Sequence, residues 1–494
     1  MGSLSHILCS LAGLALVLST SDARAQSFTD ALTAAYRSNP RLLAERERVK
    51  EADESWVQAR AEGRPTVGAS LTATPTVVRT PSSAFFGGSD LGTADVSGTS
   101  TTSVVSRQAG LEIIQPIYQG GRVRAQLRQA EAGILAAREA LRDVEQSVLQ
   151  QAADAYAAVI RDEEAARIRR ANVRVLMRQG EAATVRFDVG EGTRTDIALA
   201  DSRLALARIG LAQADAQLAS SRAAFERVVG TPPQQLSGVP RFVLPATLPE
   251  AVGIALADNP LLRQSLLNQS AADAGVDVAK SASRPQVSLN GQLAVLREQL
   301  SALTSAEAAQ VTAQVTIPIF AGGANRSRVR QAKHARNRAG FEARDAERLI
   351  RQSVAEVWAQ IEAARASVTA ARTQVASAEI AFEGVELEQQ VGTRTALDVL
   401  DAEQELADAR LSLVDTERAE NAATFQLLAL LGAFDADSLQ LPVDLYDAGA
   451  HFRRVRLDDF DSVVRTVTGK GEPDDLEFDA TTLQLGPPLR LAGE

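Results

Sequence analysis

The chain has 494 residues, a net charge of −10 and one cysteine, and only 4% of its residues are aromatic. Nucleic acid is not an expected partner, because its binding depends on cationic contacts with phosphates. The single cysteine, Cys9, allows no disulfide within the chain and no cysteine-rich metal site. Alanine and aliphatic residues dominate, which suits long, closely packed helices better than a large globular core.

Residues 1–25 have the pattern of a secretory signal peptide. Residues 7–18 are mostly apolar, and Ala23-Arg24-Ala25 is a small-x-small cleavage site, so we expect the mature chain to begin at Gln26. After this leader no run of 18 apolar residues occurs, and ordinary transmembrane helices are therefore not expected. Membrane strands with alternating residues remain possible, because hydropathy does not detect them.

Landmarks in the first half of the chain recur in the second half, in the same order and at two constant offsets. The pairs are Asn39-Pro40 with Asn259-Pro260, Arg64-Pro65 with Arg284-Pro285, and Pro116-Ile117-Tyr118-Gln119-Gly120-Gly121 with Pro318-Ile319-Phe320-Ala321-Gly322-Gly323. Ordered pairs of this kind indicate an internal duplication. We assign residues 26–245 to a first repeat and residues 246–434 to a second. Residues 435–494 form an acidic C-terminal tail, predicted to be partly folded or disordered.

Each half is predicted to form a helix, two strands, and two long helices separated by a break. The first helix begins near Phe28 and ends before Pro65, which cannot continue it. Alternating apolar residues then predict strands, and the last of them extends to Ile319. Residues 75–103, rich in Ser, Thr and Gly and including Phe85 and Phe86, are predicted to form a long loop, with a shorter one at residues 297–309.

The long helices make up most of the chain. Residues 122–188 contain no proline and only two glycines, so a single helix of about 100 Å is expected. In the second half, apolar residues at heptad positions a and d form a stripe between polar flanks. Such a narrow stripe favours helices packed edge to edge in a sheath over a globular core. The stripe consists of Ile350, Val354, Val357, Ile361, Ala364, Val368, Ala371, Val375, Ala378, Phe382 and Val385.

The two breaks between long helices carry polar residues. Residues 391–395 (Val-Gly-Thr-Arg-Thr) interrupt the second pattern, and Asp398 and Asp401 follow on one helix face. Residues 189–197 form the matching break, in which Asp196 corresponds to Asp398. By themselves, these carboxylates are ordinary charges at helix N-termini, where the helix dipole favours them. Polar residues at both tips nevertheless indicate a partner or a pore.

Four strands are too few for one chain to close a barrel, since the smallest membrane barrels have about eight. An open amphipathic sheet is not stable in lipid, because its edges leave backbone groups unpaired. Either the strands lie outside a membrane or several chains combine them. Three chains would supply 4 × 3 = 12 strands.

The landmark order, the paired Pro-Ile-aromatic-x-Gly-Gly motifs and the run Val391-Gly392-Thr393-Arg394-Thr395-Ala396-Leu397-Asp398-Val399-Leu400-Asp401-Ala402 resemble the TolC family of outer-membrane efflux proteins. The resemblance covers about residues 28–432. It implies a mainly α chain with a β-barrel part: a homotrimer with a 12-stranded barrel in outer-membrane lipid and an α-helical tunnel in the periplasm. It also implies an exit duct for tripartite efflux or type I secretion. Such a duct passes drugs or proteins from an inner-membrane RND or ABC transporter, with a periplasmic adaptor.

The resemblance implies roles for residues at the tips. Arg394 matches the family's gate arginine, and Thr195 and Asp196 match its partners on the neighbouring hairpin. Gln389 stands where the family's type member has a gate tyrosine. A tyrosine–aspartate hydrogen bond would therefore be replaced here by a glutamine–aspartate one.

Asp398 and Asp401 match the family's acidic ring at the entrance of the tunnel. Six carboxylates from three copies would favour cations. No enzyme activity, cofactor or resident metal is expected, because the sequence has no phosphate-binding loop and no nucleophile or metal motif. The alternative is a soluble periplasmic coiled-coil adaptor or scaffold protein, which would account for the helices and the leader but poorly for the alternating strands.

Overall fold

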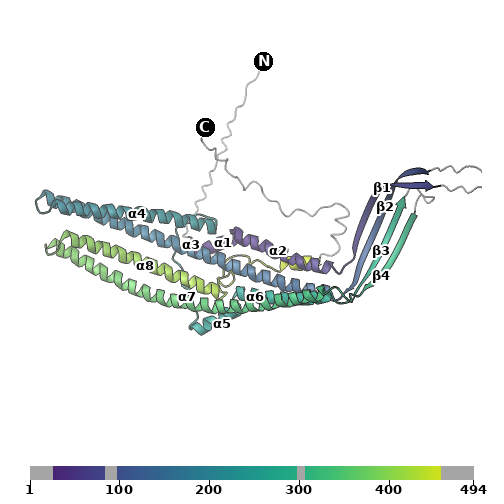
Figure 1. The fold of residues 1–494 in the computed structure, drawn as a ribbon. Coiled ribbons are helices and arrows are strands. Elements are labelled where there is room, and N and C mark those ends of the chain that lie inside the picture. The colour runs from purple at the N-terminus through teal and green to yellow at the C-terminus, as the bar shows by residue number, and fades with distance from the viewer. Residues whose placement is uncertain (1–25, 84–96, 298–305, 458–494) are drawn as a thin grey trace, which may run out of the picture. The chain divides into compact units, whose positions relative to one another are not determined.

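The computed structural model describes residues 26–83, 97–297 and 306–457, and its elements follow the same order twice (Figure 1). The first series is α1 (Phe28–Ser38), α2 (Pro40–Ala61), β1 (Thr66–Ser83), β2 (Ser97–Gln119), α3 (Arg122–Asp188) and α4 (Arg194–Val229). The second is α5 (Leu248–Asp258), α6 (Pro260–Ser281), β3 (Gln286–Arg297), β4 (Ala306–Thr316), α7 (Ala324–Gln390) and α8 (Ala396–Leu430), and α9 (Ala450–Leu457) comes last. The mainly α fold predicted from the sequence is confirmed. The long helices α3 and α7 have 67 residues each.

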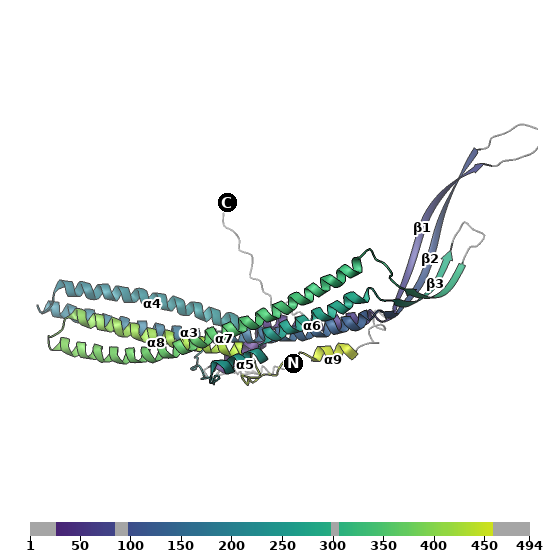
Figure 2. The same ribbon diagram turned by 60° about the horizontal axis from the view of Figure 1, so that its bottom comes forward.

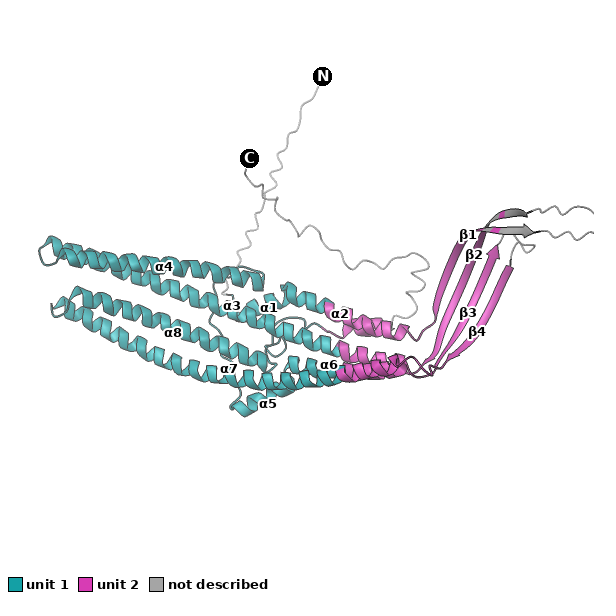
Figure 3. Cartoon of the chain, viewed as in Figure 1, with its two compact units in different colours: residues 1–47, 135–270, 335–446 teal, residues 48–134, 271–334, 447–494 magenta. Residues whose placement is uncertain are grey.

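The chain divides into two compact units, which Figure 3 colours separately. Unit 1 comprises residues 1–47, 135–270 and 335–446, and it holds the two long helical hairpins. Unit 2 comprises residues 48–134, 271–334 and 447–494, and it holds the sheet with the helix segments that enter and leave it. Among the described residues, no helix is both long enough and apolar enough to cross a membrane.

The single helix predicted for residues 28–63 is in fact two helices, because the backbone is extended at Asn39 (φ −68°, ψ 119°). The ring of Pro40 clashes with the backbone of the residue before it, which disfavours a helical conformation at Asn39. The Asn39 side-chain amide donates a hydrogen bond to the carbonyl of Val228 at 3.0 Å, and Asn259 donates in the same way to Leu430. The Asn-Pro pairs therefore end one helix and also satisfy carbonyls at the ends of α4 and α8.

The four strands form one antiparallel sheet in the order β1-β2-β3-β4, as Figures 1 and 2 show. The predicted loop at residues 75–103 is wrong at both ends, since residues 75–83 and 97–103 belong to β1 and β2. Pro75 and Pro81 are tolerated because β1 is an edge strand, and threonine is a good strand former. The Phe85-Phe86 pair lies outside the described residues.

The Gly-Gly pairs mark the change from strand to helix, as predicted. Gly120 and Gly121 have φ values of 63° and 84°, and α3 begins at the next residue. Gly322 and Gly323 precede α7 with φ values of 58° and 84°. These values lie in the left-handed region, which glycine adopts at little cost.

Two further predicted boundaries of the second strand pair are wrong. The shorter loop does not extend to residue 309, because β4 begins at Ala306. The strand predicted to reach Ile319 ends at Thr316, which pairs with Gln286, the first residue of β3. Beyond Thr316 the partner strand has ended, and Pro318 offers no backbone N–H for pairing.

The core of unit 1 is an aromatic cluster between the helices. Phe28 packs edge-on against Tyr156 and stacks on Phe425, with ring centroids 5.4 and 5.7 Å apart. Phe434 packs against Phe425 at 5.8 Å. The hydroxyl of Tyr156 lies 2.7 Å from the carbonyl oxygen of Ser237 and 3.0 Å from that of Gln26, and its single proton can be donated to either. Farther along α7, the heptad stripe is confirmed: each of its members is buried or half-buried.

Part of the predicted tail is folded. In unit 1, Ala436 and Leu441 are buried. In unit 2, α9 packs against α2, where Phe452 lies edge-on to Trp56 at 5.6 Å and His451 Nδ1 lies 3.3 Å from Asp53. Residues 458–494 lie outside the described residues, as does the leader.

Candidate gate at the hairpin tips

The two tips of the helical hairpins have the same backbone construction. Gly190 (φ 82°) follows α3, and Gly392 (φ 83°) follows α7. Thr193 and Thr395 are the N-caps of α4 and α8, and both have extended backbone. Glycine supplies the left-handed turn, and threonine satisfies the first free N–H groups of the next helix.

Asp196 and Asp398 complete a capping box at each tip. One carboxylate oxygen of Asp196 accepts hydrogen bonds from the Thr193 backbone N–H at 2.9 Å and from its hydroxyl at 2.8 Å. Asp398 accepts the same two bonds from Thr395 at 2.9 and 2.8 Å. These bonds lower the pKa of both carboxyl groups. Both residues therefore have a structural role as helix caps, which is common for carboxylates at helix N-termini.

Arg394 is held within its own hairpin. Its Nε donates a hydrogen bond to Glu388 at 2.9 Å, and this contact raises the pKa of the guanidinium. The expected partners Thr195 and Asp196 belong to the other hairpin, and Thr195 is exposed. Among the described residues of one chain, Arg394 forms no hydrogen bond with Thr195 or Asp196. A bond between Arg394 of one chain and these residues of a neighbouring chain stays a prediction.

Gln389 connects the two hairpins through a residue that the sequence did not single out. Arg186, near the end of α3, donates to the Gln389 side-chain carbonyl at 3.4 Å. The amide nitrogen of Gln389 is buried and has no hydrogen-bond partner among the described residues. Arg186 aligns with Glu388 in the internal repeat. The opposite charges at these two equivalent positions were a signal in the sequence that could have identified Arg186.

The two aspartates of the predicted entrance ring have different surroundings. Asp398 is occupied by the capping box, whereas Asp401 forms an ion pair with Arg203 of α4 at 2.7 Å. The Asp401 side chain is 55% exposed. Arg203 was missed, because it aligns with Glu405 and nothing in its local sequence points to a partner 198 residues away.

Further polar contacts join α3 to α8 along the hairpins. Asn172 donates to Glu403 at 3.3 Å, and both side chains are buried. Burial raises the pKa of the Glu403 carboxyl, and the hydrogen bond from Asn172 offsets only part of this rise. Arg161 donates to Asp415 at 2.6 Å. Because exposed ion pairs contribute little, the buried contact sets the register more strongly than the exposed ones.

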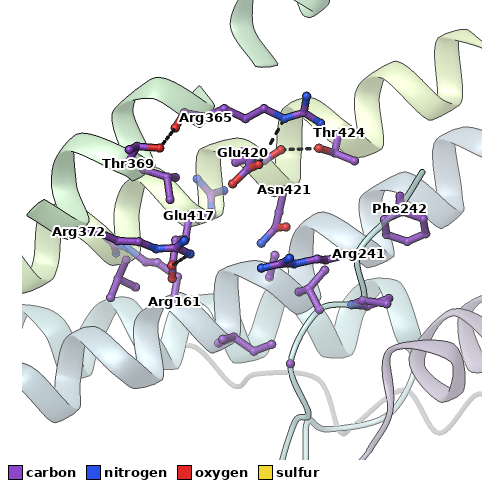
Figure 4. A pocket seen from close by; sticks show the side chains of 18 of the residues that line it. Arg161, Arg241, Phe242, Arg365, Thr369, Arg372, Glu417, Glu420, Asn421 and Thr424 are labelled. Carbon is purple, nitrogen blue, oxygen red and sulfur yellow. Dashed lines mark hydrogen bonds and ion pairs between the residues drawn. The ribbon is translucent and has the colours of Figure 1, made fainter. Parts of the chain in front are cut away.

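A cavity of about 630 Å³ lies between α3, α7, α8 and the linker after α4 (Figure 4). Arginines from all four segments line it, but several face carboxylates: Arg372 binds Glu417 at 3.0 Å and Arg365 lies 3.7 Å from Glu420. These ion pairs join α7 to α8. No group of three or more His, Cys, Asp or Glu residues suited to a metal ion occurs within the described part of the chain.

Comparison with known proteins assigns the chain to a family. The model of the outer membrane efflux protein family matches residues 31–231 and 251–433. The outer membrane efflux protein BepC of Brucella suis is 32% identical over 89% of this chain and 92% of its own length. The outer membrane protein TolC of Escherichia coli is 26% identical over 61% of this chain and 66% of its own length.

The fold agrees with this assignment. The crystal structure of the Campylobacter jejuni CmeC outer membrane channel covers 86% of this chain and 88% of that one, with a TM-score of 0.70 at 16% identity. The alternative of a soluble adaptor or scaffold is not favoured by any of these similarities. The chain belongs to the outer membrane efflux protein family.

Proposed function

We propose that three copies of this chain form one continuous duct, with a shared 12-stranded barrel in the outer membrane and an α-helical tunnel in the periplasm. As an outer membrane efflux protein, the chain serves as an exit duct for efflux or type I secretion. The observation that carries the trimer is a four-stranded sheet that has one apolar face and two open edges.

One face of the sheet is apolar and exposed. Residues directly opposite each other in an antiparallel pair share a face, so the register assigns each side chain. Val67, Leu71 and Val311 are 65%, 84% and 74% exposed. An apolar sheet face of this kind is suited to contact with lipid. The apolar residues of this face include Val67, Ala69, Leu71, Ala109, Leu111, Ile113, Leu289, Leu293, Val295, Ala309, Val311, Ala313 and Val315. Polar residues of the same face lie toward its two ends: Gln115 at one, and Arg107, Arg297 and Glu307 at the other, where β3 ends and β4 begins.

The opposite face is polar and suits a water-filled lumen. Glu112 lies opposite Gly68 on one side and Gln292 on the other, and Gln292 lies opposite Gln310. Within the described residues, β1 and β4 each pair with only one strand. Backbone groups at an unpaired edge are costly in lipid. Pairing β4 of one copy with β1 of the next would satisfy both edges.

The repeat boundaries at residues 26–245 and 246–434 are part of this proposal. Equal lengths of corresponding elements support them: α1 and α5 have 11 residues each, α2 and α6 have 22, and α3 and α7 have 67. Residues 1–25 are proposed to be a signal peptide and residues 435–494 a C-terminal extension.

The tips of the hairpins are proposed to form the periplasmic gate. Arg394, Thr195, Asp196 and Gln389 would hold it closed, with Asp398 and Asp401 at its entrance. Charge-assisted bonds are strong enough to hold a closed tip, and exposed ones are weak enough to be replaced by a partner. A periplasmic adaptor and an inner-membrane RND or ABC transporter are the proposed partners that open it.

The assembly can be tested by outer-membrane fractionation followed by native mass spectrometry of the purified protein in detergent. We expect the protein in the outer-membrane fraction, with a mass three times that of the mature chain. A monomer in the soluble periplasmic fraction would contradict the proposal.

A further inference from the structure

Exposed cations gather where the strands give way to the long helices. The first three turns of α7 carry Arg326, Arg328, Arg330 and Lys333. In the first half of the chain, the first turn of α3 carries Arg124. All five side chains are exposed. The five residues fall within the ranges of unit 2, which also holds the sheet and is coloured magenta in Figure 3. We call these five residues the basic collar.

Few carboxylates lie near the basic collar to neutralise its positive charge. Residues 317–341 contain six Lys and Arg residues and no Asp or Glu. The neighbouring arginines Arg122 and Arg128 pair with Glu62 and Asp277 at 3.0 and 2.9 Å. By contrast, within the described residues no collar side chain forms an ion pair, and only Arg328 has a side-chain hydrogen bond, to Asn325 at 3.2 Å.

Exposed apolar and aromatic side chains lie between the collar and the sheet. Ile117 and Tyr118 end β2 with exposures of 63% and 47%. Ile319 and Phe320 stand just before α7, 94% and 87% exposed. Aromatic residues are typical of the boundary between lipid and water, and cations just beyond this boundary meet headgroup phosphates.

We propose that the basic collar binds the headgroup phosphates of anionic phospholipids in the leaflet that faces the periplasm. The argument rests on the proposed outer-membrane placement of the sheet. The occupant follows from continuity: an apolar sheet face, then exposed aromatic residues, then cations without carboxylate partners. Arginine is the matching residue, because its planar guanidinium binds phosphate oxygens through two parallel hydrogen bonds.

The test compares two triple variants of the full-length mature protein. The collar variant carries Arg326→Gln, Arg328→Gln and Arg330→Gln. The control variant carries Arg344→Gln, Arg348→Gln and Arg351→Gln, which remove the same charge about five turns farther along α7. Native mass spectrometry in detergent counts bound lipid during competition between phosphatidylglycerol and phosphatidylcholine. The same spectra show whether each variant keeps its assembly.

Wild type and the control variant are expected to prefer phosphatidylglycerol by about tenfold, and the collar variant should lose most of this preference. Equal binding of both lipids by wild type, or an unchanged preference in the collar variant, would overturn the proposal that the basic collar binds anionic phospholipids. So would full competition by glycerol 3-phosphate, because it would indicate a site for free anions. Wild-type protein that is only monomeric in the same spectra would contradict the proposed function itself.

Discussion

The two hairpin tips share one backbone and differ in their charges. Both have a glycine near φ 82° after the long helix and a threonine–aspartate capping box before the next one. The second tip carries Arg394 where the first has Gly192, and Glu388 where the first has Arg186. The shared residues therefore build the turn, and the unshared Arg394 and Glu388 give the second tip charges that the first tip lacks.

Replacing the turn glycines should have the largest effect on stability. Gly190→Ala and Gly392→Ala each place a Cβ at positive φ, which costs about 1–2 kcal/mol. Hydrogen exchange of the tip amides should show the same loss of protection at both tips. As the control, Gly384→Ala lies inside α7 without a positive φ, and should stabilise the helix by about 0.5–1 kcal/mol. A loss at one tip alone would break the structural equivalence.

Removing the cap hydroxyls comes next. Thr193→Ala and Thr395→Ala should each destabilise the start of the following helix by about 1 kcal/mol. Thr→Ser at either position keeps the hydroxyl and should restore most of the protection measured by hydrogen exchange. Unequal losses would mean that a further contact, absent from the described residues, supports one of the tips.

Acid should loosen both tips together. Hydrogen bonds from the threonines lower the pKa of Asp196 and Asp398 below their ordinary value of 3.8. Because the folded pKa is the lower one, the stabilisation is present above the unfolded pKa and is lost as the pH falls through the folded value. Tip protection should therefore decrease below about pH 4. NMR titration of the two carboxylates should give lowered values that rise in the Thr→Ala variants.

Asp154 on α3 provides a contrast of opposite sign. Burial raises its pKa to about 6, although Arg418 opposes the shift. The folded state then binds a proton more tightly than the unfolded state, so stability should rise as the pH falls from 6 toward 4. Asp154→Asn should remove this rise without changing the acid response of the tips.

Arg394→Gln should have the smallest effect on stability, because its ion pair with Glu388 is exposed. It acts only on the second tip, and so isolates the difference between the two. If Arg394 holds the proposed gate, its loss should increase the resting conductance of the purified channel. Unchanged conductance would remove Arg394 from the gate.

Most of the fold could be predicted from the sequence, because the periodic patterns are long. The heptad stripe from Ile350 to Val385 and the Gly-Gly pairs are confirmed by burial and by backbone angles. The errors concern the ends of strands. Residues 75–83 are mostly polar and contain two prolines, which are typical of loops, yet pairing with β2 makes them a strand. Local composition carries no information about such a partner.

The candidate site could be predicted only as a set of residues. The resemblance identified Arg394 and Asp398, whereas the contacts that hold the tips involve Glu388, Arg186 and Arg203. Glu388 and Arg394 are six residues apart, but Arg186 and Arg203 meet their partners through the packing of the hairpins, 203 and 198 positions away in sequence. Their pairing depends on helix register, which a single sequence does not specify.

The central claim is that this chain forms a channel with an acidic entrance. The most direct test is the single-channel conductance of the purified protein in planar bilayers, for wild type and for Asp398→Ala with Asp401→Ala. We predict cation-selective channels whose selectivity falls in the double variant, because the entrance loses its carboxylates. Folded protein that forms no channels at all would contradict the claim.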